Sequence, residues 1–116
     1  MLDLLEARLR LNEMVKEWRS YAKRIAEAAR TLLGTCEVSV FGSVVKGQAT
    51  GASDVDILIV SDKIPKSCKG RGELKAKIEE EAGLPLYHPF EIHLATDEEA
   101  RENPVYRSAT KEGVAV

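Results

Sequence analysis

The sequence contains no long uninterrupted run of apolar residues, only two cysteines and almost no excess of either charge. No stretch approaches the roughly 18 apolar residues that a membrane-spanning helix needs, so we expect no membrane segment. Cys36 and Cys68 form neither a CxxC pair nor a disulfide framework, which fits a reducing compartment. The first residues also lack the basic and then apolar pattern of a signal peptide. We therefore expect a cytoplasmic protein.

The net charge of −2 gives the protein no general attraction for nucleic acid, so any such binding would have to be local. Apolar residues make up 44% of the chain and charged residues 31%, which are the proportions of a soluble globular protein. A chain of 116 residues can build one modest hydrophobic core. We predict a single domain over residues 1–116.

The first third of the chain has the spacing of an amphipathic helix. Apolar residues recur every three or four positions from Leu11 to Leu33, which places them on one face. Gly34 is a natural end, because glycine readily adopts the left-handed conformation that terminates helices. A pattern of about thirty residues is long for a globular helix. Either the helix breaks near Asn12, or its first turns extend to meet another chain.

The rest of the chain alternates strand and helix patterns. Three segments are predicted to be strands: residues 37–41 and 90–95, where polar and apolar residues alternate, and residues 54–60, which end in a run of aliphatic residues. Between and after them we expect a helical turn at 44–46, a polar loop at 61–72, and helices at 72–82 and after Thr96. The tail beyond Pro104 has no clear pattern. This order predicts an α/β (α+β) fold in which helices pack against a small mixed sheet.

Two carboxylates stand at the start of the second predicted strand. Asp54 and Asp56 are separated by one residue, so they would face the same side of the strand, about 7 Å apart at Cα. Two anions beside an aliphatic strand repel each other. A divalent cation such as Mg²⁺ relieves the repulsion by binding carboxylates together with substrate phosphates. An ordinary pair of surface aspartates is the alternative.

A glycine and a serine directly follow the first predicted strand. Gly42 permits close approach of a ligand to the backbone, and the amides after it, with the Ser43 hydroxyl, could donate to phosphate. A strand-ending turn without a ligand is the alternative. Neither this pair nor the two aspartates is specific alone.

The specific feature is their combination in residues 41–60, FGSVVKGQATGASDVDILIV. This stretch closely resembles the signature of the DNA polymerase β-like nucleotidyltransferase superfamily, and most of all its minimal nucleotidyltransferases. The resemblance implies a nucleotidyltransferase fold, ATP or another nucleoside triphosphate as substrate, and two Mg²⁺ ions. The family also needs a third carboxylate on a later strand. Glu91 is the only acidic residue within such a strand, although an exposed strand glutamate is the alternative.

The resemblance assigns roles to seven residues. Metal binding and catalysis fall to Asp54, Asp56 and Glu91, and nucleotide binding to Gly42, Ser43, Lys46 and Ser53. Two positions depart from the family pattern. Many relatives carry aspartate in place of Glu91, and often a basic residue in place of Val44, which leaves Lys46 as the single cation of this loop.

Two further features are open to more than one interpretation. His93 would share the face of Glu91 and contact nucleotide or acceptor, or it is a hydrogen-bonded structural residue, whereas we expect no such role for His88. From Asp62 to Lys77, six basic residues stand against two acidic ones and could engage triphosphate, RNA or an acidic partner. That stretch contains no aromatic residue to stack on bases, which favours a solvated loop.

The resemblance implies transfer of a nucleoside monophosphate, AMP above all, to a hydroxyl acceptor. Larger relatives append a domain that grips the base or acceptor, so we expect another chain to complete this site. The family implies a helical HEPN protein, often a toxin for which the nucleotidyltransferase is the antitoxin; a homodimer is the other possibility. The alternative function is a non-catalytic nucleotide- or partner-binding module that retains the fold. Nucleic acid is not an expected partner.

Overall fold

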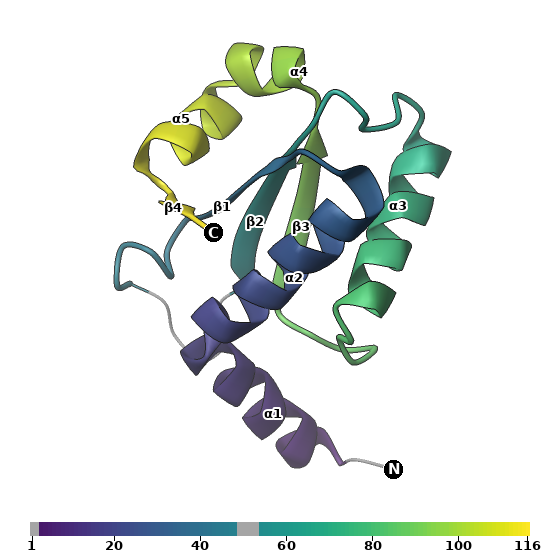
Figure 1. The fold of residues 1–116 in the computed structure, drawn as a ribbon. Coiled ribbons are helices and arrows are strands. Elements are labelled where there is room, and N and C mark those ends of the chain that lie inside the picture. The colour runs from purple at the N-terminus through teal and green to yellow at the C-terminus, as the bar shows by residue number, and fades with distance from the viewer. Residues whose placement is uncertain (1–2, 49–53) are drawn as a thin grey trace.

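A four-stranded sheet forms the centre of the computed structural model, which describes residues 3–48 and 54–116 (Figure 1). The strands, in the spatial order β3-β2-β1-β4, are β1 (Glu37–Phe41), β2 (Val55–Val60), β3 (Phe90–Ala95) and β4 (Val114–Ala115). β2 runs parallel to β3 and antiparallel to β1, and β1 runs antiparallel to β4. The prediction of a small mixed sheet is therefore confirmed.

β2 occupies the interior of the sheet, as its aliphatic run predicts. Ile57 and Ile59 are fully buried on one face, and Leu58 is 1% exposed on the other. A strand that is buried on both sides has no need of polar alternation, which explains the continuous apolar sequence. Asp56, at the beginning of this strand, is the exception, and its side chain keeps 27% exposure.

Helices cover both faces of the sheet, but unequally. The larger cluster of buried apolar residues joins α2 (Trp18–Leu33) and α3 (Cys68–Glu81) to the face that carries Ile57 and Ile59. A smaller cluster joins α4 (Asp97–Glu102) and α5 (Pro104–Glu112) to the face that carries Leu58 and Val60. Figure 1 shows α2 and α3 on one side of the strands, α4 beyond the end of β3, and α5 beside β1 and β4. Asp56 belongs to the less covered face, because alternate strand residues share a side.

The long N-terminal pattern forms two helices, α1 (Leu4–Lys16) and α2, separated at Glu17. The break therefore falls five residues after Asn12. Glu17 adopts φ −100° and ψ 30°, outside the helical range, and starts a new direction for the chain. Only Met14 and Val15 of α1 are buried, while its first turns lead away from the sheet (Figure 1).

Two parts of the chain differ from the sequence expectations. α3 begins at Cys68 rather than Gly72, because the Ser67 hydroxyl accepts from the amide of Gly70 and caps the helix four residues earlier. The tail, which had no clear pattern, forms α5 and β4. The helix after Thr96 is confirmed as α4, with the complete Thr96–Glu99 capping box. No helix within residues 3–48 and 54–116 is both long and apolar enough to cross a membrane.

Candidate active site

One end of the sheet collects the residues for which the sequence predicts chemistry. β1 and β2 are antiparallel, so the end of β1 at Phe41 lies beside the start of β2 at Asp56. β2 and β3 are parallel, and Glu91 is the register partner of Asp56. The Gly42-Ser43 turn leaves β1 at this same end. Strand direction alone therefore brings together segments that are far apart in the sequence.

Asp56, Glu91 and His93 form a compact group of possible metal ligands. One carboxylate or imidazole atom from each lies within 4.8 Å of the others. The Nε2 atom of His93 is 3.3 Å from Oδ1 of Asp56 and 3.9 Å from Oε1 of Glu91. The side chain of Glu91 is 54% exposed, whereas those of Asp56 and His93 are 27% and 23% exposed. The group is thus open to solvent on the Glu91 side and packed on the other.

Gly42 lies directly against the Asp56 carboxylate. Its φ of +86° is in the left-handed region, which glycine adopts without strain. A Cβ atom at this position would lie 2.7 Å from Oδ2 of Asp56. Both the backbone conformation and the limited space therefore require glycine at this position. The backbone of the turn consequently lies beside the Asp56 carboxylate.

The chain after Gly42 forms hydrogen-bonded turns instead of the expected helical segment. The amide of Lys46 donates to the Gly42 carbonyl at 3.4 Å, and the amide of Gln48 donates to the Ser43 carbonyl at 2.9 Å. The glycine conformation at Gly42 and again at Gly47, with φ +71°, prevents a regular helix. Gly42 and Lys46 line one side of a cavity of about 380 Å³, and α5 lines the other. This volume falls within the range of small-molecule sites.

One of the predicted metal ligands stands apart from the compact group. Asp54 is exposed, immediately before β2, and does not belong to the three residues whose ligand atoms converge. Ser53 lies outside the described residues. The structure therefore brings together Asp56 and Glu91 with the Gly42-Ser43 turn, and adds His93.

Comparison with known proteins identifies the family of the chain. The family model of the nucleotidyltransferase domain matches residues 22–116. The chain belongs to this nucleotidyltransferase domain family. The match confirms the family predicted from residues 41–60, and it begins within α2, so α1 lies outside it.

Two solved structures share the nucleotidyltransferase fold. One is a candidate nucleotidyltransferase from Sulfolobus solfataricus, with 20% sequence identity and a TM-score of 0.57 over 96% of this chain and 83% of that one. The other is a further candidate nucleotidyltransferase, with 30% identity and a TM-score of 0.55 over 72% of this chain and 87% of that one. No curated protein matches the chain.

The donor set of this nucleotidyltransferase fits a divalent metal ion. Asp56 and Glu91 supply carboxylate oxygens, which Mg²⁺ and Mn²⁺ bind, and two carboxylates at this separation repel each other in the absence of a cation. The additional methylene of Glu91, compared with aspartate, does not prevent the carboxylate from reaching the group. His93 supplies an imidazole nitrogen, which suits transition metals better than Mg²⁺.

The surroundings of His93 include residues that sequence reasoning missed. The imidazole packs against the rings of Phe41 and Tyr106, at centroid distances of 5.3 and 5.8 Å. The Tyr106 hydroxyl is 3.4 Å from Nδ1 of His93. The period of two along β3 already placed His93 on the face of Glu91. The role of Tyr106 had no sequence signal, since it depends on how α5 folds back over the sheet.

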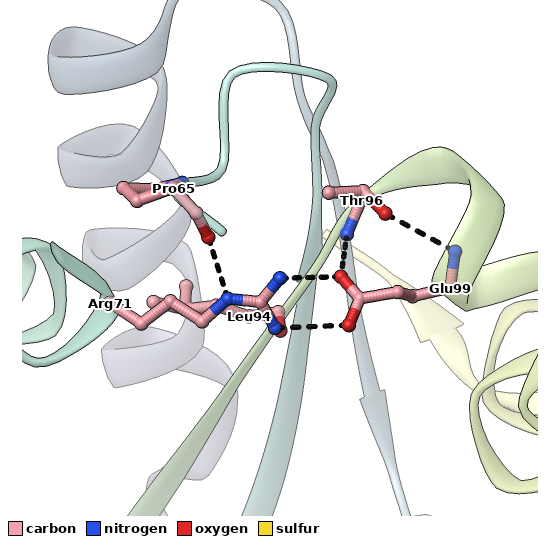
Figure 2. A network of polar contacts seen from close by, with 5 residues as sticks. All are labelled: Pro65, Arg71, Leu94, Thr96 and Glu99. Carbon is pink, nitrogen blue, oxygen red and sulfur yellow. Dashed lines mark hydrogen bonds and ion pairs between the residues drawn. The ribbon is translucent and has the colours of Figure 1, made fainter. Parts of the chain in front are cut away.

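The basic stretch before and within α3 serves a structural role at Arg71, the residue at the centre of Figure 2. Its guanidinium donates to both carboxylate oxygens of Glu99, at 2.6 and 3.2 Å, and to the carbonyls of Pro65 and Leu94 (Figure 2). These hydrogen bonds from Arg71 hold the pKa of Glu99 at about 2, well below its usual range. Because α3 packs on the sheet face opposite Asp56, this helix does not face the carboxylate group.

His88 makes structural contacts at the start of β3. Its Nδ1 accepts from the amide of Phe90 at 3.1 Å, and its Nε2 lies 2.5 Å from Oε2 of Glu79 on α3. With Nδ1 accepting, Nε2 carries the proton and donates to the carboxylate. The side chain is only 7% exposed. His88 thus fastens the start of β3 to α3.

Proposed function

We propose that this nucleotidyltransferase transfers a nucleoside monophosphate, AMP from ATP, to a hydroxyl group of an acceptor, with release of pyrophosphate. The observation that carries the proposal is the convergence of Asp56 and Glu91 beside the Gly42-Ser43 turn. Carboxylates that hold a divalent ion and backbone donors that hold phosphate are the two elements that phosphoryl-group chemistry requires. The arrangement belongs to a chain of the corresponding family.

In this proposal each residue has a defined task. Asp56 and Glu91 hold Mg²⁺ or a similar ion, with Asp54 as a further ligand for the second of two ions. When bound, such ions polarise the phosphate and activate the acceptor hydroxyl. Gly42 and Ser43 donate to the β- and γ-phosphates. Lys46 and Ser53, the remaining predicted contacts, neutralise and orient the same triphosphate.

The acceptor side is proposed to come from another chain. The family resemblance favours a helical HEPN protein, for which this chain would be the antitoxin, and a homodimer is the alternative. Exposed leucines support a protein partner at α1: Leu4, Leu5 and Leu9 are 78%, 66% and 53% exposed. Apolar side chains of this size on one short helix are a common feature of contact surfaces.

The non-catalytic alternative rests on one specific observation. Asp54, which should share the metal, is not among the three residues whose ligand atoms converge. A chain that binds nucleotide or partner without transfer needs no second ion. The two functions differ in whether covalent transfer occurs and in whether it depends on Asp56.

A transfer assay separates them. The purified chain is incubated with α-labelled ATP, Mg²⁺ or Mn²⁺, and the protein encoded by the neighbouring gene. We expect label on that protein, with loss on the order of 100-fold or more for Asp56→Asn. Asp62→Asn, an exposed aspartate just after the other end of β2, is the matched control and should retain full transfer. Equal transfer by both variants would contradict the proposed site; no transfer, with partner binding intact, would favour the non-catalytic module.

A further inference from the structure

His93 is placed as a metal ligand would be. It stands two residues after Glu91 on β3, so both side chains leave the strand on one side. Its Nε2, rather than Nδ1, faces the carboxylates of Asp56 and Glu91. Nε2 lies 3.3 Å from Oδ1 of Asp56, close to the roughly 3 Å that separates ligand atoms about 2.1 Å from one metal ion, and somewhat farther, 3.9 Å, from Oε1 of the more exposed Glu91.

The ring is held in this orientation from behind. Phe41 and Tyr106 both pack against it, and the Tyr106 hydroxyl lies 3.4 Å from Nδ1. Histidine ligands of metals generally donate their other ring N–H to an oxygen, which fixes the tautomer and the ring. Tyrosine suits both states of this histidine, because a hydroxyl can donate or accept. When Nδ1–H donates to the Tyr106 hydroxyl, the Nε2 lone pair is available to a metal ion.

We infer that His93 binds the metal ion of this site through Nε2, with Tyr106 as its positioning residue, and that it shifts the preference of the site from Mg²⁺ toward Mn²⁺ and Co²⁺. The inference rests on the proposed function, whose carboxylates it shares. Its physical basis is the ligand set: two oxygens and one imidazole nitrogen suit first-row transition metals, whereas Mg²⁺ prefers oxygen alone.

The test measures metal affinity directly. Mn²⁺ and Mg²⁺ are titrated by calorimetry into the protein with a non-hydrolysable ATP analogue, and Co²⁺ by its visible absorption. For the wild type we expect Mn²⁺ to bind at least about tenfold more tightly than Mg²⁺. His93→Phe keeps an aromatic ring against Phe41 and Tyr106 but has no ligand atom. We expect it to lose about tenfold or more in Mn²⁺ and Co²⁺ affinity while Mg²⁺ affinity changes less than threefold.

Two further variants keep the test decisive. Tyr106→Phe removes only the hydroxyl and should lower Mn²⁺ affinity about 10-fold, with a changed Co²⁺ spectrum that a purely structural role would not produce. His88→Gln removes the only other imidazole of the chain and should leave metal affinity unchanged. If folded His93→Phe binds Mn²⁺ and Co²⁺ as tightly as the wild type, the inference fails while the proposed function stands. If Asp56→Asn also leaves metal binding and transfer unchanged, the proposed function fails too.

Discussion

The Arg71–Glu99 pair offers a stability prediction whose size and pH dependence both follow from the structure. Glu99→Gln removes the negative charge that Arg71 contacts through two hydrogen bonds, but keeps an oxygen that can accept from the Thr96 amide (Figure 2). The Glu99 side chain is 44% exposed, so water screens the interaction strongly. We therefore expect a loss of about 1 kcal/mol in unfolding free energy at pH 7, at the upper end for such pairs.

The loss of unfolding free energy in Glu99→Gln should become smaller as the pH falls. The folded-state pKa of Glu99 is about 2, below its ordinary value, so the ionised form is the stabilised one. Its contribution is complete above about pH 5 and disappears as the pH falls from about 4.5 to 2. The difference between wild type and Glu99→Gln should thus be constant from pH 5 to 8 and fall by about half near pH 3.

Urea unfolding at pH 7, 5, 4 and 3 measures this difference. Glu98→Gln is the matched control, because Glu98 occupies the same first turn of α4 and shares the favourable interaction with the helix dipole. At pH 7, Glu99→Gln should lose about 1 kcal/mol of unfolding free energy relative to the wild type, and Glu98→Gln less than about 0.5 kcal/mol. Equal effects of the two variants, or a Glu99→Gln effect that grows on acidification, would refute this reasoning.

Two other predictions concern backbone geometry and helix packing. Gly42→Ala should lower the unfolding free energy by about 1–2 kcal/mol because of its left-handed φ, and should also weaken metal binding, since its Cβ displaces the Asp56 carboxylate. Gly72→Ala is the control: it lies inside α3, where a Cβ meets nothing within 4 Å, and it should be neutral or stabilising by up to about 1 kcal/mol. Thermal unfolding of the two variants compares these effects directly. Arg24→Ala removes three hydrogen bonds to the carbonyls that end α3, two of them to Ala82, and should cost about 1–3 kcal/mol in urea unfolding; a loss below about 0.5 kcal/mol would show that this contact contributes little.

The sequence predicted β1, β2, β3 and the family because local pattern determines them, whereas the short β4 had no such pattern. The aliphatic run of β2 reflects burial on two faces, and the capping box at Thr96 is a contact between near neighbours. Residues 41–60 carried the family signature without any knowledge of strand pairing. For the same reason Asp56 and Glu91 could be named before their register was known.

The remaining features depend on contacts between distant segments. The break at Glu17 depends on the direction in which α2 packs, since the apolar spacing continues across it. The close approach of Gly42 to Asp56 exists only once β1 and β2 pair. Tyr106 reaches His93 only because α5 returns over the sheet, and Arg71 reaches Glu99 only because the fold brings α3 and α4 together.

The central claim is that Asp56 and Glu91 hold a metal ion beside a triphosphate bound at the Gly42-Ser43 turn. Anomalous diffraction from crystals grown with Mn²⁺ and a non-hydrolysable ATP analogue tests it most directly. We predict a manganese peak about 2.0–2.4 Å from a carboxylate oxygen of each residue, with the terminal phosphates at the amides after Gly42. A bound triphosphate at another place, or a manganese peak that neither carboxylate contacts, would contradict the claim.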